Sequence, residues 1–173
     1  MSVGNLKIWK GVAAGAIGGL AASWVMEEFQ YAWIKIAKAR SQPDGNSRST
    51  DSNDEPATVK AAEAVSKKVF GHELAENEKK IGANAVHYAT GGASGAIYGA
   101  TAELIPEVKA GAGLPFGTAV WLALDEGAVP LLGLSKGPTQ YPLSTHAYAL
   151  ASHFVYGVTT EVVRRTLRKT VLR

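Results

Sequence analysis

The chain contains no cysteine, and this absence excludes disulfide bonds and thiolate metal sites. Charged residues are few, at 19% of the 173 residues, and a net charge of +3 is too small to indicate a nucleic-acid-binding protein. Clusters of strand-favouring residues are scarce as well. The length suits one domain or one small bundle, and the composition predicts an all-α fold.

No catalytic motif is present either. The serines and threonines of the apolar segments do not stand in a G-x-S-x-G elbow. The glycines have helical spacing inside apolar sequence, so they predict packing faces and not a phosphate-binding loop. No segment carries an E-x-x-H pair, which argues against a di-iron carboxylate centre. We therefore predict that the protein is not an enzyme.

What the chain does contain is four apolar segments, each long enough to cross a bilayer. They run from about Ile8 to Arg40, from Ala83 to Leu104, from Gly111 to Leu134, and from Pro142 to the basic C-terminal tail. Aromatic residues near the ends of the first segment suit the belts at membrane interfaces. The pattern predicts an integral membrane four-helix bundle with one amphipathic helix outside the membrane.

Two alternatives to this interpretation stay open. The segments are rich in glycine and alanine and only weakly hydrophobic, so a soluble all-helical bundle would also explain them. The N-terminus begins like a signal peptide, with Lys7 and Lys10 before an apolar stretch. Because apolar residues resume after Glu27 and Glu28, and no clear cleavage site follows, we interpret this segment as a retained membrane helix.

We divide the chain into three parts. Residues 1–40 form the first transmembrane helix and its extension, 41–82 a polar loop and a surface helix, and 83–173 three transmembrane helices and a basic tail. The surface helix is expected over residues 56–80, because its apolar residues approximate one stripe.

Three boundary predictions accompany this division. Asn77 or Gly82 is expected to end the surface helix. Pro130 is expected to kink or end the third apolar segment, because proline removes a helical hydrogen bond. Ser144 or Thr145 is expected to cap the fourth segment.

Two of the apolar segments carry glycines spaced by four residues, a pattern that permits close helix packing. These glycines are Gly11, Gly15 and Gly19 in the first segment and Gly91, Gly95 and Gly99 in the second. We expect the first stripe to contact a helix of the same chain, with self-dimerisation as the alternative.

Every apolar segment also carries titratable residues, which are costly inside hydrocarbon and usually have a use there. They are Glu27, Glu28, His87, Asp125, Glu126 and His153. Counting from the flanking polar residues at about 1.5 Å per residue places all of them roughly 10 to 14 Å from the same membrane face. We predict that the four helices hold them in one polar layer.

This layer has three interpretations. It is a structural hydrogen-bond cluster, a site that handles protons or ions, or a metal or haem site. Tyr98, eleven residues after His87, is a candidate hydroxyl partner. His146, seven residues before His153, either extends the polar path toward the surface or rests at the interface.

The C-terminal half carries a fairly specific series of motifs. From His87 it reads HYATGGASGAIYGATAELIPEVKAG, then FGTAVW, VPLLGL, HFVYG and EVVRRTLR. This series resembles the YagU-like inner-membrane protein family over about residues 83–169. The resemblance implies a small multi-pass protein of the bacterial inner membrane and suggests a link to acid tolerance. The N-terminal segment fits more loosely, and residues 40–80 have no counterpart.

Basic residues gather at the C-terminus, at Arg164, Arg165, Arg168 and Lys169. They favour a cytoplasmic C-terminus, and with four crossings a cytoplasmic N-terminus, so the polar layer would open toward the periplasm. Nine basic residues between Lys35 and Lys80 oppose this orientation. Glu103 is expected to pair with Arg164 or Arg165, and Glu161 to cap the same basic cluster, or else both acids are solvated.

The leading functional hypothesis is a small inner-membrane protein that handles protons or ions through its buried histidines and acids. The first alternative is an accessory subunit whose glycine faces dock onto larger membrane partners. The second is a metal- or haem-binding component. Expected partners are the lipid bilayer and a homo-oligomer or larger membrane complex, and not nucleic acid.

Overall fold

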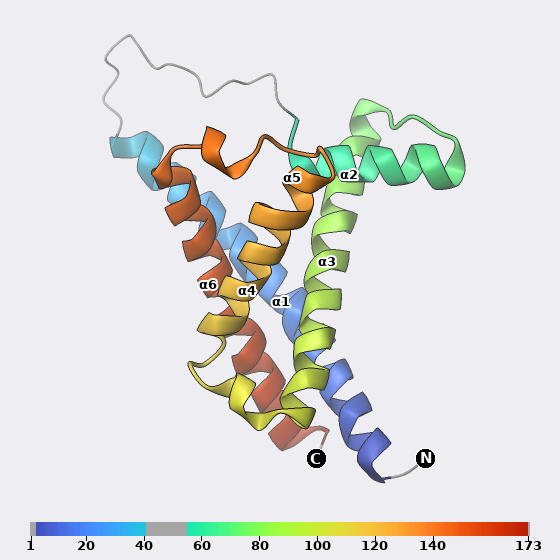
Figure 1. The fold of residues 1–173 in the computed structure, drawn as a ribbon, viewed down its shortest axis with the longest axis vertical. Coiled ribbons are helices and arrows are strands. Elements are labelled where there is room, and N and C mark those ends of the chain that lie inside the picture. Colours follow the sequence, from blue (N-terminus) through green and yellow to red (C-terminus); the bar gives the residue numbers. More distant parts are fainter. Residues whose placement is uncertain (1–2, 41–54, 173) are drawn as a thin grey trace.

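The structure is a computed structural model that describes residues 3–40 and 55–172. These residues contain no strand, so the all-α prediction is confirmed for them. The predicted polar loop lies mostly outside the described residues. Three long helices run most of the length of the bundle (Figure 1). They are α1 (Val3–Arg40), α3 (Glu76–Leu104) and α6 (Leu143–Thr170).

A fourth helical rod is built from three consecutive elements. It comprises α4 (Leu114–Ala123), the π-helical turn η3 (Leu124–Ala128) and α5 (Val129–Leu131). The rod ends one residue after Pro130, as the sequence predicts. A π-helical turn holds one residue more than an α-helical turn, and such turns are frequent at functional sites. Here it contains both Asp125 and Glu126.

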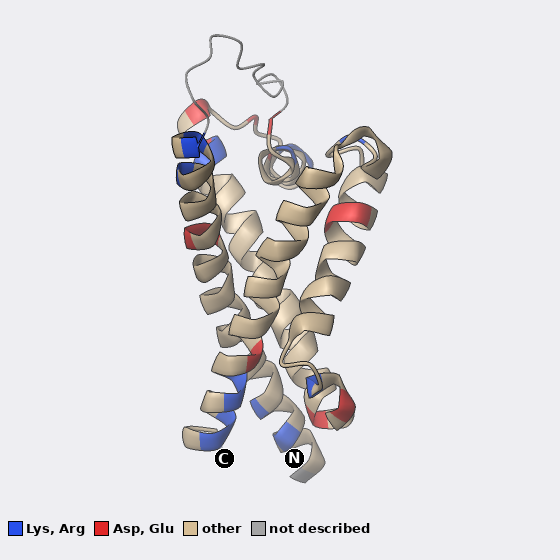
Figure 2. Ribbon diagram, turned by 90° about the vertical axis from the view of Figure 1, so that its left-hand side faces the viewer, with Lys and Arg blue, Asp and Glu red and all other residues tan. Residues whose placement is uncertain are grey.

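The rods are arranged around α1. Helix α1 packs against both α3 and α6, and α4 packs against α6. Both termini lie at one end of the bundle, and α2 (Ala57–Val65) lies at the other (Figure 1). Lysines and arginines gather at the two ends, whereas the middle of the rods is nearly free of them (Figure 2).

The two glycine stripes identified in the sequence pack against each other. A Cβ atom on Gly15 would overlap the carbonyl oxygen of Gly95, and one on Gly99 would overlap the carbonyl oxygen of Gly11. The backbones of α1 and α3 therefore touch along the seam, within one chain. Small residues permit this approach, and larger ones would hold the helices apart.

A second seam joins α4 to α6, and the sequence analysis missed it. A Cβ atom on Gly117 would overlap the carbonyl oxygen of His153, and one on Gly157 would overlap that of Gly113. Spacing by four is present between Gly113 and Gly117, but Gly157 stands alone on its helix. The seam fixes the backbone around His153 against the fourth rod.

The prediction of one helix over residues 56–80 is wrong. The structure has α2, a π-helical turn η1 (Ser66–Phe70), a turn and then α3 from Glu76. Gly71 permits the turn with a left-handed φ of 64°. Gly82 does not break the chain but lies inside α3, where its missing side chain makes room for Ala62 of α2.

The start of α3 is capped by its own third residue. The carboxylate of Glu78 accepts a hydrogen bond from the backbone N–H of Ala75, at 2.8 Å. This bond, with a second from the His72 ring, holds the pKa of Glu78 below its ordinary value. At the start of α6, Pro142 occupies the cap position and no side chain caps the helix, so the prediction of Ser144 or Thr145 is wrong.

The distribution of side chains is inverted relative to a soluble bundle. Large apolar side chains in the middle of the rods are exposed, among them Ile17, Trp24, Ile97 and Leu122. The residues buried between the rods include polar and charged ones: Ser23, Ser152, His153, Thr160, Glu161 and Arg164. Aqueous proteins place few such groups inside.

Length and composition identify one helix of the described residues as able to cross a membrane, at Gly4–Arg40. One such helix near an N-terminus is weak support for membrane association, since a core helix or a signal sequence has the same properties.

Candidate functional site

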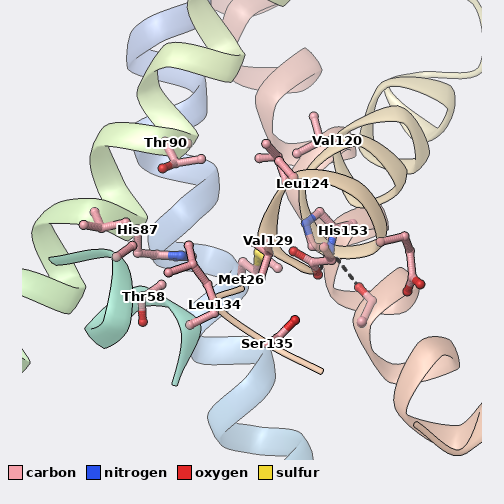
Figure 3. A pocket seen from close by; sticks show the side chains of 18 of the residues that line it. Met26, Thr58, His87, Thr90, Val120, Leu124, Val129, Leu134, Ser135 and His153 are labelled. Carbon is pink, nitrogen blue, oxygen red and sulfur yellow. Dashed lines mark hydrogen bonds and ion pairs between the residues drawn. The ribbon is translucent and has the colours of Figure 1, made fainter. Parts of the chain in front are cut away.

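A cavity of about 640 Å³ opens at the α2 end of the bundle. Its walls come from α1, α2, α3, the fourth rod, the loop before α6, and α6 itself. Close contacts join α1 to α3 and α4 to α6, and they leave room between α3 and the fourth rod. Figure 3 shows His87 and His153 on opposite sides of this space, with Met26 and Val129 between them.

Three histidine–carboxylate pairs line the cavity. The Nε2 atom of His87 lies 3.9 Å from Glu27 Oε1, which joins α3 to α1. The Nδ1 atom of His153 lies 3.7 Å from Asp125 Oδ2, which joins α6 to the π-helical turn.

The third pair joins the same two elements at closer range. The Nδ1 atom of His146 lies 2.7 Å from Glu126 Oε1. The Nε2 atom of the same ring lies 3.0 Å from the carbonyl oxygen of Pro138. When Glu126 is ionised both partners are acceptors, so both ring nitrogens donate and the ring is the charged imidazolium.

The other two histidines need only one proton each. His153 donates from Nδ1 to the carbonyl oxygen of Ala149, at 2.9 Å, which leaves the lone pair of a neutral ring on Nε2. His87 directs Nε2 at the carbonyl oxygen of Ser23, at 3.4 Å, so its lone pair lies on Nδ1. Each ring can accept one further proton, and a neighbouring carboxylate stabilises the resulting charge.

Five of the six residues predicted for the polar layer line the cavity, namely Glu27, His87, Asp125, Glu126 and His153. Glu28 does not, and its side chain is exposed. One residue along a helix corresponds to a rotation of about 100°, so two consecutive acids cannot both face the same neighbours. His146 also lines the cavity, as the hypothesis of an extended polar path requires.

Tyr98 is not the predicted hydroxyl partner of His87. Its hydroxyl donates to Glu161 Oε2, at 3.0 Å, near the opposite end of the bundle. Eleven residues share a helix face but are about 16 Å apart along the axis. The hydroxyl near the histidine comes instead from Tyr88, which donates to Glu27 Oε2 at 2.8 Å.

The sequence analysis also missed Ser23, which lines the cavity. Its side chain is 0% exposed, and its Oγ atom has no hydrogen-bond partner among the described residues. Buried polar groups nearly always have a partner. The spacing of four residues between Ser23 and Glu27, one helical turn, was the available signal.

A second ionic cluster lies between α3 and α6 near the termini. Arg164 donates twice to Glu161, at 2.7 and 2.9 Å, and both residues are buried. Glu103 accepts from Arg168 at 2.6 Å, while Arg164 lies 3.9 Å away. The predicted pairing of Glu103 with Arg164 is therefore present at 3.9 Å, and Arg168, which was not predicted, is the closer partner. Arg164 and Arg168 are internal ion-pair residues, not parts of a solvated basic patch.

Aromatic side chains separate the cavity from this cluster. Tyr98 and Phe116 stack with ring centroids 4.2 Å apart, and Phe116 lies 5.7 Å from Tyr156. The Tyr156 hydroxyl donates to the carbonyl oxygen of Gly91 at 2.6 Å. Tyr156 lines the cavity, so this ring marks where the cavity stops.

No three histidine, aspartate or glutamate side chains of residues 3–40 and 55–172 are close enough together to hold one metal ion. The histidines and acids of the cavity form separate pairs.

Fold and site together define an all-α protein that encloses a cavity of histidine–carboxylate pairs. The sequence model of DUF1440, a family of proteins of unknown function, matches residues 47–162. The chain therefore belongs to the DUF1440 family. No curated protein and no solved structure matches it. The family description names no activity, so the resemblance to YagU-like proteins stays a prediction.

Proposed function

We propose that this protein is a small multi-pass protein of the bacterial inner membrane that takes up and releases protons in its histidine–carboxylate cavity. The observation that carries the proposal is the pair of histidines that line the cavity, His87 and His153, each within 4 Å of a carboxylate. Acid tolerance, which the YagU-like resemblance suggests, would be a fitting physiological setting.

The membrane part of the proposal rests on the inverted side-chain distribution. Exposing a large apolar side chain to water costs about 1.5 to 3 kcal/mol relative to burying it. Ile17, Trp24, Ile97 and Leu122 are all exposed in the middle of their helices. Lipid removes this cost. Helix α3, with 29 residues, spans about 44 Å and exceeds the ~30 Å hydrocarbon core.

The orientation follows from the two ends of the bundle. Both termini lie at one end (Figure 1), and the nearby basic residues of α1 and α6, Lys7, Lys10, Arg165 and Lys169, favour the cytoplasm. The cavity lies at the α2 end and would then open to the periplasm. Basic residues at the α2 end oppose this orientation, and a reporter fused to the C-terminus would decide it.

The proton chemistry uses the lone pairs left by the hydrogen bonds. A proton added to Nε2 of His153 gives an imidazolium beside Asp125, and one added to Nδ1 of His87 gives an imidazolium beside Glu27. Histidine is the side chain that titrates closest to neutral pH. The net charge of the cavity can therefore change when the pH of the medium outside the cell falls.

The accessory-subunit hypothesis loses the feature on which it depended. It required the glycine faces of the first two apolar segments for docking onto partners. Gly15 and Gly95 lie against each other inside the chain, so their faces are covered.

The test is a pH titration of the full chain in lipid nanodiscs, in which nitrogen NMR reports the protonation of each histidine. We expect the rings of His87 and His153 each to gain a second proton when the sample is acidified. Asp125→Asn should disfavour the imidazolium form of His153, since a nearby carboxylate stabilises the charged ring. The matched control is Glu107→Gln, which changes an exposed acid near the termini. Two outcomes would refute the proposal: His87 and His153 stay neutral over the whole pH range, or the protonation of His153 is unchanged by Asp125→Asn.

A further inference from the structure

The cavity is much larger than proton binding requires. Its volume of about 640 Å³ falls within the range of small-molecule sites, which is about 300 to 1,000 Å³. Part of its wall is apolar, including Met26, Val120, Leu124 and Val129. Such sites combine an apolar wall with a few polar groups that orient the ligand.

The charges on its wall favour a positive ligand. Three carboxylates line the cavity, from Glu27, Asp125 and Glu126. The positive groups are the imidazolium of His146, fixed by its two acceptors, and Lys136. Two positive charges against three negative ones leave one net negative charge while His87 and His153 are neutral. A monovalent cation would balance it.

Ser23 provides a second, independent indication of a ligand. Ser23 is among the residues that line the cavity, and its buried Oγ atom has no hydrogen-bond partner among the described residues. A hydroxyl oxygen accepts hydrogen bonds from an ammonium group. Ser23 lies one helical turn from Glu27 on α1, so both residues are on the face of α1 that borders the cavity.

We propose that the cavity binds a small organic cation, an alkylammonium group with a short apolar tail, in competition with protons. The ammonium would lie between Ser23, Glu27 and Asp125, and the tail against the apolar wall. This inference rests on the proposed function, because protonation of His87 and His153 is what reverses the charge. Two added protons change the cavity from one net negative to one net positive charge, and the cation is then expelled.

The groups that face these histidines support the competition. Glu27 faces His87 from α1, and Tyr88 donates to that same carboxylate from α3. Asp125 faces His153 from the π-helical turn, and Tyr156 lines the cavity from the same helix as His153. Helix α2 contributes no titratable group to the wall. Acid therefore acts on the cavity through the two histidines and their carboxylates.

The experiment is calorimetric titration of the full chain in nanodiscs with n-butylamine, which is butylammonium at pH 7.5. Empty nanodiscs give the background, and n-butanol and butyrate are the neutral and negative controls. We expect saturable binding of one butylammonium, no binding of either control, and at least tenfold weaker binding at pH 5.5.

Three variants test the assigned contacts. Glu27→Gln and Asp125→Asn should each weaken binding at least tenfold, and Ser23→Ala by several-fold. Glu107→Gln, outside the cavity, should bind like the natural chain. Circular dichroism and size-exclusion profiles establish that each variant is folded. Ser23→Ala keeps the test decisive if a carboxylate variant fails to fold, since Ser23 Oγ has no partner to lose.

The outcomes separate this inference from the proposed function. Absent butylammonium binding, with His87 and His153 still titrating, overturns the cation site and leaves proton binding in place. Equal binding of n-butanol shows a merely apolar pocket and also overturns it. Binding that is unchanged at pH 5.5 overturns the competition. Histidines that do not titrate overturn the proposed function itself.

Discussion

The two ends of the bundle both bring acids and bases together, yet they do so in opposite ways. Near the termini, Arg164 and Glu161 are joined by bonds of 2.7 and 2.9 Å, and the side chains are 5% and 2% exposed. In the cavity, His153 and Asp125 are 3.7 Å apart, and the acid is 41% exposed. We call the end near the termini closed, because its pair is in direct contact and buried. We call the cavity end open, because its pair is more widely spaced and its acid is partly exposed.

The difference follows from the bases involved. Arginine stays charged at any physiological pH, so a buried arginine–carboxylate pair cannot change its charge and can only fix the helices. Histidine gains and loses a proton near neutral pH. A loosely spaced pair beside a cavity can therefore respond to protons or ligands. We interpret the closed end as a structural clamp and the open end as the functional site.

The largest expected effect concerns the closed end. Arg164→Ala should lower the free energy of unfolding by about 3 to 5 kcal/mol, because it leaves the Glu161 carboxylate buried without its main partner. The control is its neighbour, Arg165→Ala. That side chain is 57% exposed and lies 3.5 Å from Glu161, so its loss should cost less than about 1 kcal/mol. Equilibrium unfolding in SDS micelles measures both, and equal losses would contradict the clamp.

A smaller effect is expected at the glycine seam that connects the two ends. Gly95→Ala places a Cβ atom against the Gly15 carbonyl oxygen, so the helices must move apart. Overpacking of this kind costs about 1 to 3 kcal/mol. The control is Gly4→Ala, since a Cβ atom there meets nothing within 4 Å. The same unfolding assay applies, and an unchanged Gly95 variant would show that the seam yields easily.

The smallest effect on stability is expected in the cavity. Asp125→Asn should lower the free energy of unfolding by less than about 1 kcal/mol, because the acid is partly exposed and its ion pair is loose. Proton uptake between pH 8 and 5, measured by titration of the folded protein, should nevertheless change. A loss of stability as large as that of Arg164→Ala would place the cavity pairs among the structural ones.

Much of the scaffold could be predicted from local sequence. Each of the four apolar segments is helical, and the fourth rod ends close to Pro130 as predicted, with Gly133 turning the chain at a left-handed φ of 71°. The errors occurred where two parts of the chain meet. Gly82 reads as a helix breaker, yet it is the place where α2 packs on α3. The turn was built at Gly71 instead, where the left-handed φ needs glycine.

The candidate site was predicted in most of its residues but not in its pairs. Helical rise depends only on residue number, so counting residues could bring His87, Asp125 and His153 to one level. Counting could not separate Glu27 from Glu28, because rotation about the helix axis depends on the neighbouring helices. Nor could it find Ser23, whose significance depends on its lack of a partner.

The sequence by itself determined the helices, the glycine stripes and the position of each ionisable residue along its helix, since these depend on local spacing along one axis. Only the tertiary structure decided which acid meets which base and where space remains. Those properties depend on the distances between helices. Residues far apart in the sequence fix these distances, as the backbone contact between Gly15 and Gly95 does for α1 and α3. The cavity exists because α1 holds α3 and α6 together while α3 and the fourth rod stay apart.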